Sequence, residues 1–157
     1  MKTTQRQSAA VIAPPPLLYV SALVLAFVVH TATPMPISLP TPMLRVFGFA
    51  LLLLSGTFAR WAFVAMKQTG TSASPRKPSV ALATDGPFRL SRNPIYVAMT
   101  GLYLAIALLG NSLWPFLLLI PLLLIMHWGV VLREERYLTQ QFGEAYLAYK
   151  SRTRRWL

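Results

Sequence analysis

The sequence predicts an all-α integral membrane protein with four transmembrane helices, a tight hairpin between the third and the fourth, and an amphipathic C-terminal cytoplasmic helix. Three observations predict this fold class. The chain is 55% hydrophobic and only 12% charged, about half the charged share of a soluble domain. Its apolar residues are gathered into long runs, and most of its basic residues lie between those runs. The 157 residues correspond in length to one domain, so we expect a single domain over residues 1–157.

Four apolar segments are the candidate spans, at residues 16–31, 44–66, 94–109 and 113–132. The second and fourth are long enough for a bilayer core, which needs about 20 residues, whereas the first and third are near the lower limit. Gly110-Asn111-Ser112 separates the last two spans, and this turn signal predicts the tight hairpin. Pro121 lies inside the fourth span and predicts a kink.

The basic residues predict the orientation of these spans. Lys and Arg lie before the first span, in the loop 67–93 and in the tail 133–157, whereas the other two connections contain none. The exceptions, Arg45 and Arg60, lie inside the second span. The positive-inside rule then places both termini and the loop in the cytoplasm, for a protein of the inner membrane. No clear small-x-small cleavage site follows the first span, so we expect it to remain uncleaved.

The composition excludes several kinds of site. There are no cysteines, which excludes disulfides, thiolate metal ligands and cysteine nucleophiles. The two histidines, His30 and His127, are far apart in sequence, so we expect no metal centre. The net charge of +11 is placed between hydrophobic runs, which is typical of contact with anionic lipid head groups. Membrane lipids are therefore the expected partners, and nucleic acid is not.

Two of the four acidic residues, Glu134 and Glu135, are neighbours directly after the fourth span. An anionic pair at a membrane edge needs a cationic partner, which either the protein or a ligand can supply. His127 is seven residues before Glu134, and on an ideal helix the two share a face. A structural role for His127 within the bundle and a place in a pocket both remain open.

The third span has a strong helix start, with Asn93 as N-cap and Pro94 at the first helical position. Its free backbone N–H groups would attract a carboxylate or phosphate, and Arg92 adds further donors beside them. An ordinary capped helix with a lipid-facing arginine would show the same pattern, so both interpretations stay open.

The tail after Glu135 has apolar residues at helical spacing, which predicts an amphipathic helix broken into two pieces at Gly143. Its aromatic residues could pack on the bundle or contact a ligand, and its basic end is typical of a surface helix on anionic lipid. The apolar positions are Leu138, Phe142, Ala145, Tyr146 and Tyr149.

Taken in order, these segments resemble the isoprenylcysteine carboxyl methyltransferase family, in its bacterial form, and the related phospholipid N-methyltransferases. The resemblance covers residues 81–157. It is carried by the stretches Thr84-Asp85-Gly86-Pro87-Phe88, Ser91-Arg92-Asn93-Pro94-Ile95-Tyr96, Arg133-Glu134-Glu135-Arg136-Tyr137-Leu138 and Phe142-Gly143-Glu144-Ala145-Tyr146-Leu147-Ala148-Tyr149-Lys150, with Asn111 in the hairpin turn.

The resemblance implies that the cofactor is S-adenosylmethionine, bound on the cytoplasmic side. We expect Arg92 and Glu134 to be the catalytic residues, with Arg92 orienting an anionic acceptor or the cofactor. A helix N-terminus suits the cofactor's carboxylate, and a glutamate suits its ammonium or ribose hydroxyls. By motif position, the cofactor site would be lined by Leu82, Ala83, Phe88, Asn93, Pro94, Ile95, Tyr96, Glu134 and Glu135.

Two positions depart from the isoprenylcysteine pattern. Asn93 stands where those enzymes usually have histidine, and Val130 stands where they tend to carry an arginine for the substrate carboxylate. The first change keeps a hydrogen-bonding side chain. The second removes the expected substrate ligand, which puts carboxyl methylation of a prenylated cysteine in question.

The expected function is therefore methyl transfer from S-adenosylmethionine to a lipophilic small molecule or a lipidated substrate. Carboxyl O-methylation of an isoprenylcysteine-like group and N-methylation of a phospholipid amine are both candidate reactions. The sequence has no glycine-rich strand-to-helix fingerprint, which excludes a soluble Rossmann-type methyltransferase. A non-catalytic four-helix scaffold is the main alternative. A small transporter is disfavoured because every carboxylate lies outside the predicted spans.

Overall fold

The computed structural model describes residues 9–70 and 81–157, and within these ranges it contains helices and no strands. Three helices are long and apolar enough to cross a membrane. They are α1 (Pro15–Ala32), α2 (Thr41–Gln68) and the continuous helix Trp114–Phe142. The apolar helix α3 (Pro94–Leu109) has 16 residues. At 1.5 Å per residue it is about 24 Å long, somewhat short of a bilayer core, so a fourth span remains a prediction.

The continuous helix Trp114–Phe142 has three parts. These are α4 (Trp114–Met126), a five-residue π-helical turn η2 (His127–Val131) and α5 (Leu132–Phe142). Pro121 lies inside α4, which continues past it. The apolar part of this helix ends at Leu132, and Arg133 begins a charged segment beyond it. We therefore treat Glu134 and Glu135 as lying outside the membrane-spanning part.

The predicted hairpin is present, since α3 ends at Leu109 and α4 begins at Trp114. Asn111 takes a positive φ of 47° in the turn, and its side chain accepts a hydrogen bond of 2.9 Å from the Ile37 N–H. The hairpin turn is thus tied to the connection between α1 and α2.

Small residues allow α2 and α3 to approach closely. A Cβ added at Gly101 of α3 would collide with the Ser55 side chain of α2, and one added at Gly48 would meet Leu109 at 2.7 Å. In a membrane, where no hydrophobic effect drives helices together, helices commonly pack by close approach of their backbones at small residues.

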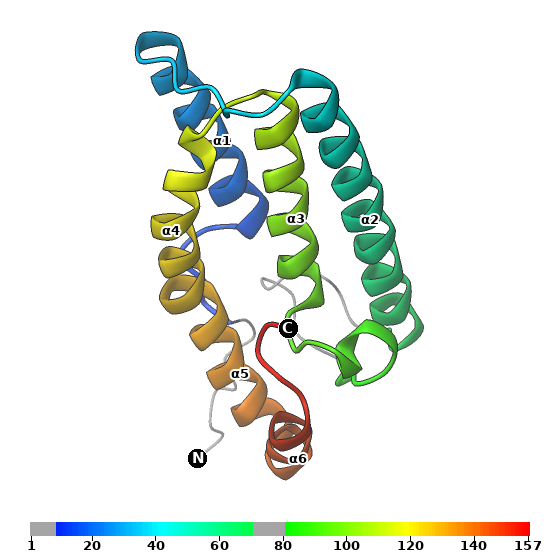
Figure 1. Cartoon of the computed structure of the whole chain (residues 1–157). Coiled ribbons are helices and arrows are strands. Elements are labelled where there is room, and N and C mark those ends of the chain that lie inside the picture. The colour runs from blue at the N-terminus through cyan, green and yellow to red at the C-terminus, as the bar shows by residue number, and fades with distance from the viewer. Residues whose placement is uncertain (1–8, 71–80) are drawn as a thin grey trace.

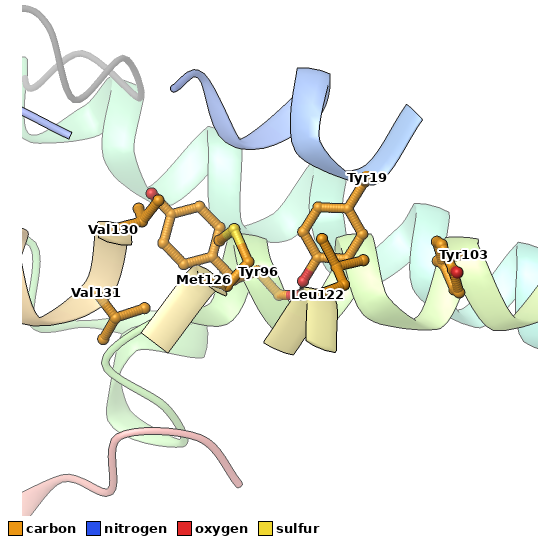
Figure 2. Close-up of a cluster of buried hydrophobic side chains, with 7 residues drawn as sticks. All are labelled: Tyr19, Tyr96, Tyr103, Leu122, Met126, Val130 and Val131. Atoms are coloured by element: carbon orange, nitrogen blue, oxygen red, sulfur yellow. Dashed lines mark hydrogen bonds between the residues drawn. The ribbon is translucent and has the colours of Figure 1, made fainter. Parts of the chain in front are cut away.

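On the other side of α3 lies the main core, between α1, α3 and the α4–η2 helix (Figure 2). Tyr19 of α1 and Tyr103 of α3 meet edge to face there, with ring centroids 6.1 Å apart. The polar ends of these buried rings are satisfied, because the Tyr19 hydroxyl lies 2.8 Å from Thr100 Oγ1 and the Tyr103 hydroxyl donates to the Pro115 carbonyl. The cluster consists of Tyr19, Tyr96, Tyr103, Leu122, Met126, Val130 and Val131.

The end of α2, the start of α3, α5 and α6 (Glu144–Arg152) gather at one end of the bundle (Figure 1). The helices α5 and α6 are separated at Gly143, as predicted, where a φ of 53° suits glycine. A short 3₁₀ helix, η1 (Gly86–Arg89), precedes α3 at the same end. Arg89 and Arg92, which precede α3, therefore lie at the same end of the bundle as the basic tail after α6.

Candidate functional site

The predicted site residues come from three segments at the end of the bundle where α3 begins. The segments are residues 81–93, the first turn of α3 and the first turn of α5, and residues 153–157 after α6 join them there (Figure 1). Residues 81–157 therefore supply the whole candidate site, which is the part of the sequence that carried the family resemblance.

Tyr96 and Glu134 lie directly together. The Tyr96 hydroxyl donates a hydrogen bond of 2.7 Å to Glu134 Oε1, across 38 residues of sequence. Burial raises the pKa of Glu134 to about 7, although the hydrogen bond from Tyr96 opposes this shift. Within the described part of the chain, Glu134 has no basic side chain within 4.0 Å. It is therefore a carboxylate that titrates near neutrality and can pair with an external cation.

Glu135, in contrast, is surrounded by cations of the protein. Arg155 donates to it twice, from Nε at 2.7 Å and from Nη2 at 3.0 Å. Arg92 Nη1 lies 3.0 Å from its Oε1, and Lys150 Nζ lies 3.7 Å from its Oε2. We call these four residues the Glu135 cluster. Burial alone would raise the pKa of Glu135, but the Arg155 hydrogen bonds and the nearby positive charges outweigh it and lower that pKa.

The two neighbouring glutamates therefore have different surroundings. The cationic partner that the sequence required is supplied to Glu135 by the protein itself. Among the described residues, Glu134 is bonded only to the neutral Tyr96 hydroxyl. Of the two carboxylates, Glu134 is the one that remains available for a ligand.

Arg92 retains unused hydrogen-bonding capacity. Its side chain is only 9% exposed, and its Nε and Nη1 atoms are buried without a hydrogen-bond partner, although Nη1 takes part in the ion pair with Glu135. Buried polar groups are normally satisfied, so unfilled guanidinium donors suit a carboxylate that arrives with a ligand.

The start of α3 is built differently from the prediction. The helix begins at Pro94 with Asn93 at the N-cap position, as predicted, but the Asn93 side chain makes no capping hydrogen bond. The Asn93 N–H donates to Ser91 Oγ at 3.0 Å, and its side-chain Nδ2 donates to the Arg155 carbonyl at 2.9 Å. The asparagine side chain is therefore bonded to the tail and not to an N–H of the first helical turn.

The tail after α6 is the part of the site that sequence reasoning missed. It folds back along the start of α3, where the Arg92 N–H donates to the Arg154 carbonyl at 2.8 Å. The same tail supplies Arg155 to the Glu135 cluster. The sequence signal for this contact was the basic run at the end of the chain, because the sequence contains only four acidic residues with which these basic side chains could pair.

Leu82, Ala83 and Phe88 lie in a second hydrophobic cluster. Ala83 and Phe88 are buried against Tyr146 and Tyr149 of α6, and Leu82 packs on them. The Tyr149 hydroxyl donates to the Phe88 carbonyl at 2.7 Å, and burial raises the pKa of Tyr149, which keeps this donor protonated. The tail aromatics thus pack on the loop, and the predicted cofactor contacts of these residues stay predictions.

The other predicted residues lie near the first turn of α3. Pro94 is buried, and Ile95 packs against the main core beside Tyr96. Val130, where the isoprenylcysteine pattern has a basic residue, is fully buried in that core (Figure 2). In the described residues there is no group of three His, Asp or Glu side chains that could hold a metal ion.

The π-helical turn separates His127 from Glu134. A π turn inserts one extra residue, which rotates the following helix by roughly 100°. The ideal-helix expectation that the two side chains share a face is therefore wrong. Glu134 contacts Tyr96, whereas His127 lines a different feature, a pocket of about 820 Å³.

This pocket, which we call the apolar pocket, is bounded by α2, α3, α4 and the tail residues Trp156 and Leu157. Its lining is almost wholly apolar. Leu54 of α2 and Leu124 of α4 line it and are also exposed on the outer surface of the bundle, so the pocket opens sideways between these helices. Its size is within the range of sites that enclose small molecules.

The family model of phospholipid methyltransferases matches residues 43–145. The chain belongs to the phospholipid methyltransferase family. The match includes Tyr96, Glu134 and the Glu135 position, and it runs from the start of α2 into α6. Membership of the phospholipid methyltransferase family confirms the relationship that the ordered motifs predicted. Together with the long apolar helices, it supports a membrane methyltransferase.

One curated relative is an uncharacterised protein of Haemophilus influenzae. It is 41% identical over 64 residues, which are 40% of this chain and 100% of the relative. No solved structure matches the chain. The assignment to the phospholipid methyltransferase family therefore rests on the sequence match, and the arrangement of the site rests on the contacts described above.

Proposed function

We propose that this protein transfers a methyl group from S-adenosylmethionine to a lipophilic acceptor at the end of the bundle where α3 begins. Membership of a methyltransferase family supports the reaction class. Three helices suited to a bilayer support a reaction at the membrane. The basic residues at this end of the bundle favour the cytoplasmic side.

The observation that carries the proposal is the contrast between Glu134 and Glu135. The amino-acid part of the cofactor has one ammonium and one carboxylate. Glu134, which has no cationic partner among the described residues, fits the ammonium. The unfilled donors of buried Arg92 fit the carboxylate. The Glu134 carboxylate and the Arg92 guanidinium therefore match the two charges of the amino-acid part of this ligand.

When bound, S-adenosylmethionine supplies an electrophilic sulfonium methyl group. The residues of the chain then have to orient the reactants and exclude water, which can contribute a large share of a rate enhancement. Tyr96 holds Glu134 in place through its hydroxyl. The Glu135 cluster fixes Arg92 and the tail beside the start of α3.

The apolar pocket supports a lipophilic acceptor that enters from the bilayer through its lateral opening. Two acceptor groups are compatible with the family: a carboxylate, as in an isoprenylcysteine-like substrate, and a phospholipid amine. An amine acceptor must lose a proton, and in that case Glu134, whose pKa burial raises to about 7, would accept the proton instead of holding the cofactor ammonium.

Calorimetric titration of the detergent-purified protein with S-adenosylmethionine and S-adenosylhomocysteine tests the cofactor. We expect saturable binding that Glu134→Gln abolishes and Glu144→Gln preserves. Glu144 is a suitable control because it is exposed at the start of α6. A folded wild-type protein that binds neither compound would favour the non-catalytic scaffold instead.

The acceptor group is tested by transfer of a radiolabelled methyl group to lipid extracts. A methyl ester releases methanol in base, whereas a methylated amine retains its label. Base-labile product would identify carboxyl methylation, and base-stable product would identify N-methylation. Label in neither lipid fraction, with cofactor binding intact, would exclude both lipid acceptors.

A further inference from the structure

The apolar pocket has a polar side chain at one of its ends. Its α3 lining runs from Val97 to Leu104, and its lining on the next helix runs from Leu123 of α4 to His127 of η2. These helices form an antiparallel hairpin, so Val97 and His127 share the end at which Trp156 also lies. That end adjoins the start of α3, where the candidate methyl-transfer site is found. The opposite end is lined by leucines.

The imidazole of His127 has unused hydrogen-bonding capacity. Neither ring nitrogen has a hydrogen-bond partner among the described residues, and the ring meets Trp128 edge-on at 5.5 Å between centroids. Thr100 also lines the pocket, but its hydroxyl is already bonded to the Tyr96 carbonyl and to the Tyr19 hydroxyl. A neutral imidazole carries one donor and one acceptor, and such groups in apolar surroundings normally find a partner.

Positive charge is in surplus near the same end. In the Glu135 cluster, Arg92, Lys150 and Arg155 face a single carboxylate. Arg155 is the residue directly before Trp156, which lines the pocket. The other carboxylate at this end is Glu134, which the proposed function pairs with the cofactor ammonium, so three cations stand against two carboxylates here. This balance favours a negatively charged head group over an ammonium group.

From these observations, we infer that His127 holds the head group of an anionic single-chain amphiphile whose chain occupies the apolar pocket. The imidazole N–H donates to the head group, and the chain extends along Leu104 and Leu123. The inference rests on the proposed function in one respect, since the bound amphiphile is then the methyl acceptor. His127 is a binding and positioning residue in this role, distinct from the cofactor ligands Glu134 and Arg92.

Photo-crosslinking tests this inference without cofactor and without methyl transfer. The full chain in nanodiscs is irradiated with a C16 fatty acid that carries a mid-chain diazirine, and labelled peptides are mapped by mass spectrometry. We expect label on the pocket faces of α2 and α3, at Leu51–Phe58 and Val97–Leu104. His127→Leu should reduce this label about tenfold or more, the order of one lost hydrogen bond to a charged group.

Trp128→Leu is the matched control. It removes the same ring contact from the same π turn, but Trp128 is 59% exposed and does not line the pocket. We expect wild-type labelling from it. A C16 amine with the same diazirine should label the pocket weakly in all three proteins. Equal labelling of His127→Leu and wild type, absence of label from the pocket in wild type, or preferential labelling by the amine would each overturn the inference.

The same samples separate this inference from the proposed function. Calorimetric binding of S-adenosylmethionine by His127→Leu should match that of wild type, which also establishes that the variant is folded. Loss of fatty-acid labelling with cofactor binding retained supports the role of His127. Normal labelling in a protein that binds no cofactor would refute the methyltransferase proposal while leaving the pocket assignment standing.

Discussion

The Tyr96 hydroxyl and Glu134 Oε1 are 2.7 Å apart, so a hydrogen bond joins the first turn of α3 to the first turn of α5. This contact connects two motifs that are 38 residues apart in the sequence. It also fixes the carboxylate that has no cationic partner among the described residues. The local environment of the candidate cofactor site therefore depends on the relative position of these two helices.

Removal of this hydrogen bond should weaken cofactor binding. We expect Tyr96→Phe to raise the dissociation constant of S-adenosylmethionine about tenfold, because a hydrogen bond to a charged group contributes about 1.5–3 kcal/mol and water replaces part of it. Calorimetry measures this change. Tyr103→Phe is the control, since it removes a hydrogen bond to Pro115 in the hairpin, and should leave the affinity unchanged. Equal affinities of wild type and Tyr96→Phe would contradict the prediction.

Cofactor affinity should rise with pH up to about pH 7. The folded-state pKa of Glu134 is raised to about 7, so the carboxylate that pairs with the ammonium is mostly protonated below that pH. The affinity should change up to about tenfold per pH unit below 7 and level off above it. Titrations between pH 5.5 and 8.5 measure this dependence. Glu134→Gln should show a flat profile, and a flat wild-type profile would exclude Glu134 as the ammonium ligand.

The ionisation of Glu134 should also make the stability of the ligand-free protein depend on pH. Because the pKa of Glu134 is higher when folded, the folded state binds more protons than the unfolded state between about pH 4.5 and 7. Its contribution to the free energy of unfolding therefore falls as pH rises through that window. The pKa of Glu135 is lowered, so its contribution is lost as pH falls below its ordinary value. Denaturation curves of Glu134→Gln and Glu135→Gln, compared with wild type at each pH, separate the two contributions.

Disruption of the Glu135 cluster should destabilise the fold. Glu135 is 6% exposed and faces three cations, so Glu135→Gln leaves buried positive charge uncompensated. We expect a loss of about 2–4 kcal/mol, somewhat reduced because Arg155 is partly exposed. Lys150→Ala should cost less than about 1 kcal/mol, since Lys150 is the most exposed and most distant cation. Denaturation in detergent measures both variants, and similar losses would contradict this picture.

Packing of α2 on α3 should depend on Gly101. A larger side chain at this position collides with Ser55, so Gly101→Leu should destabilise the protein by about 1–3 kcal/mol. Gly56 of α2 meets no atom within 4 Å of an added Cβ. Gly56→Ala should therefore stabilise the helix by about 0.5–1 kcal/mol. Thermal denaturation compares the two, and a stable Gly101→Leu would show that the α2–α3 contact is looser than described.

Local sequence signals predicted the features that short segments determine by themselves. Pro94 starts α3, the turn 110–112 forms the hairpin, and Gly143 divides the tail. The adjacent glutamates were also recognised as the acidic centre of the site. Each of these signals acts over a few residues, through backbone conformation or charge, and needs no knowledge of the distant chain.

The features that were missed depend on contacts between distant segments. The Asn93 side chain binds the Arg155 carbonyl, 62 residues away, which no local capping rule anticipates. The π turn at 127–131 has no distinct sequence signature, yet it decides that His127 and Glu134 face different features. Tertiary packing determines both, and neither a capping preference nor the period of an ideal helix can predict it.

The docking of Arg154 and Arg155 on the start of α3 has a consequence for the order in which the molecule is made. A ribosome delivers the apolar helices first, and each can enter the bilayer while translation continues. Arg92 and Asn93 receive their tail partners only after residue 155 has been added. Insertion into the membrane and completion of the site are therefore separate events in time, and a nascent chain that stops within α6 would be membrane-bound with its candidate site unfinished.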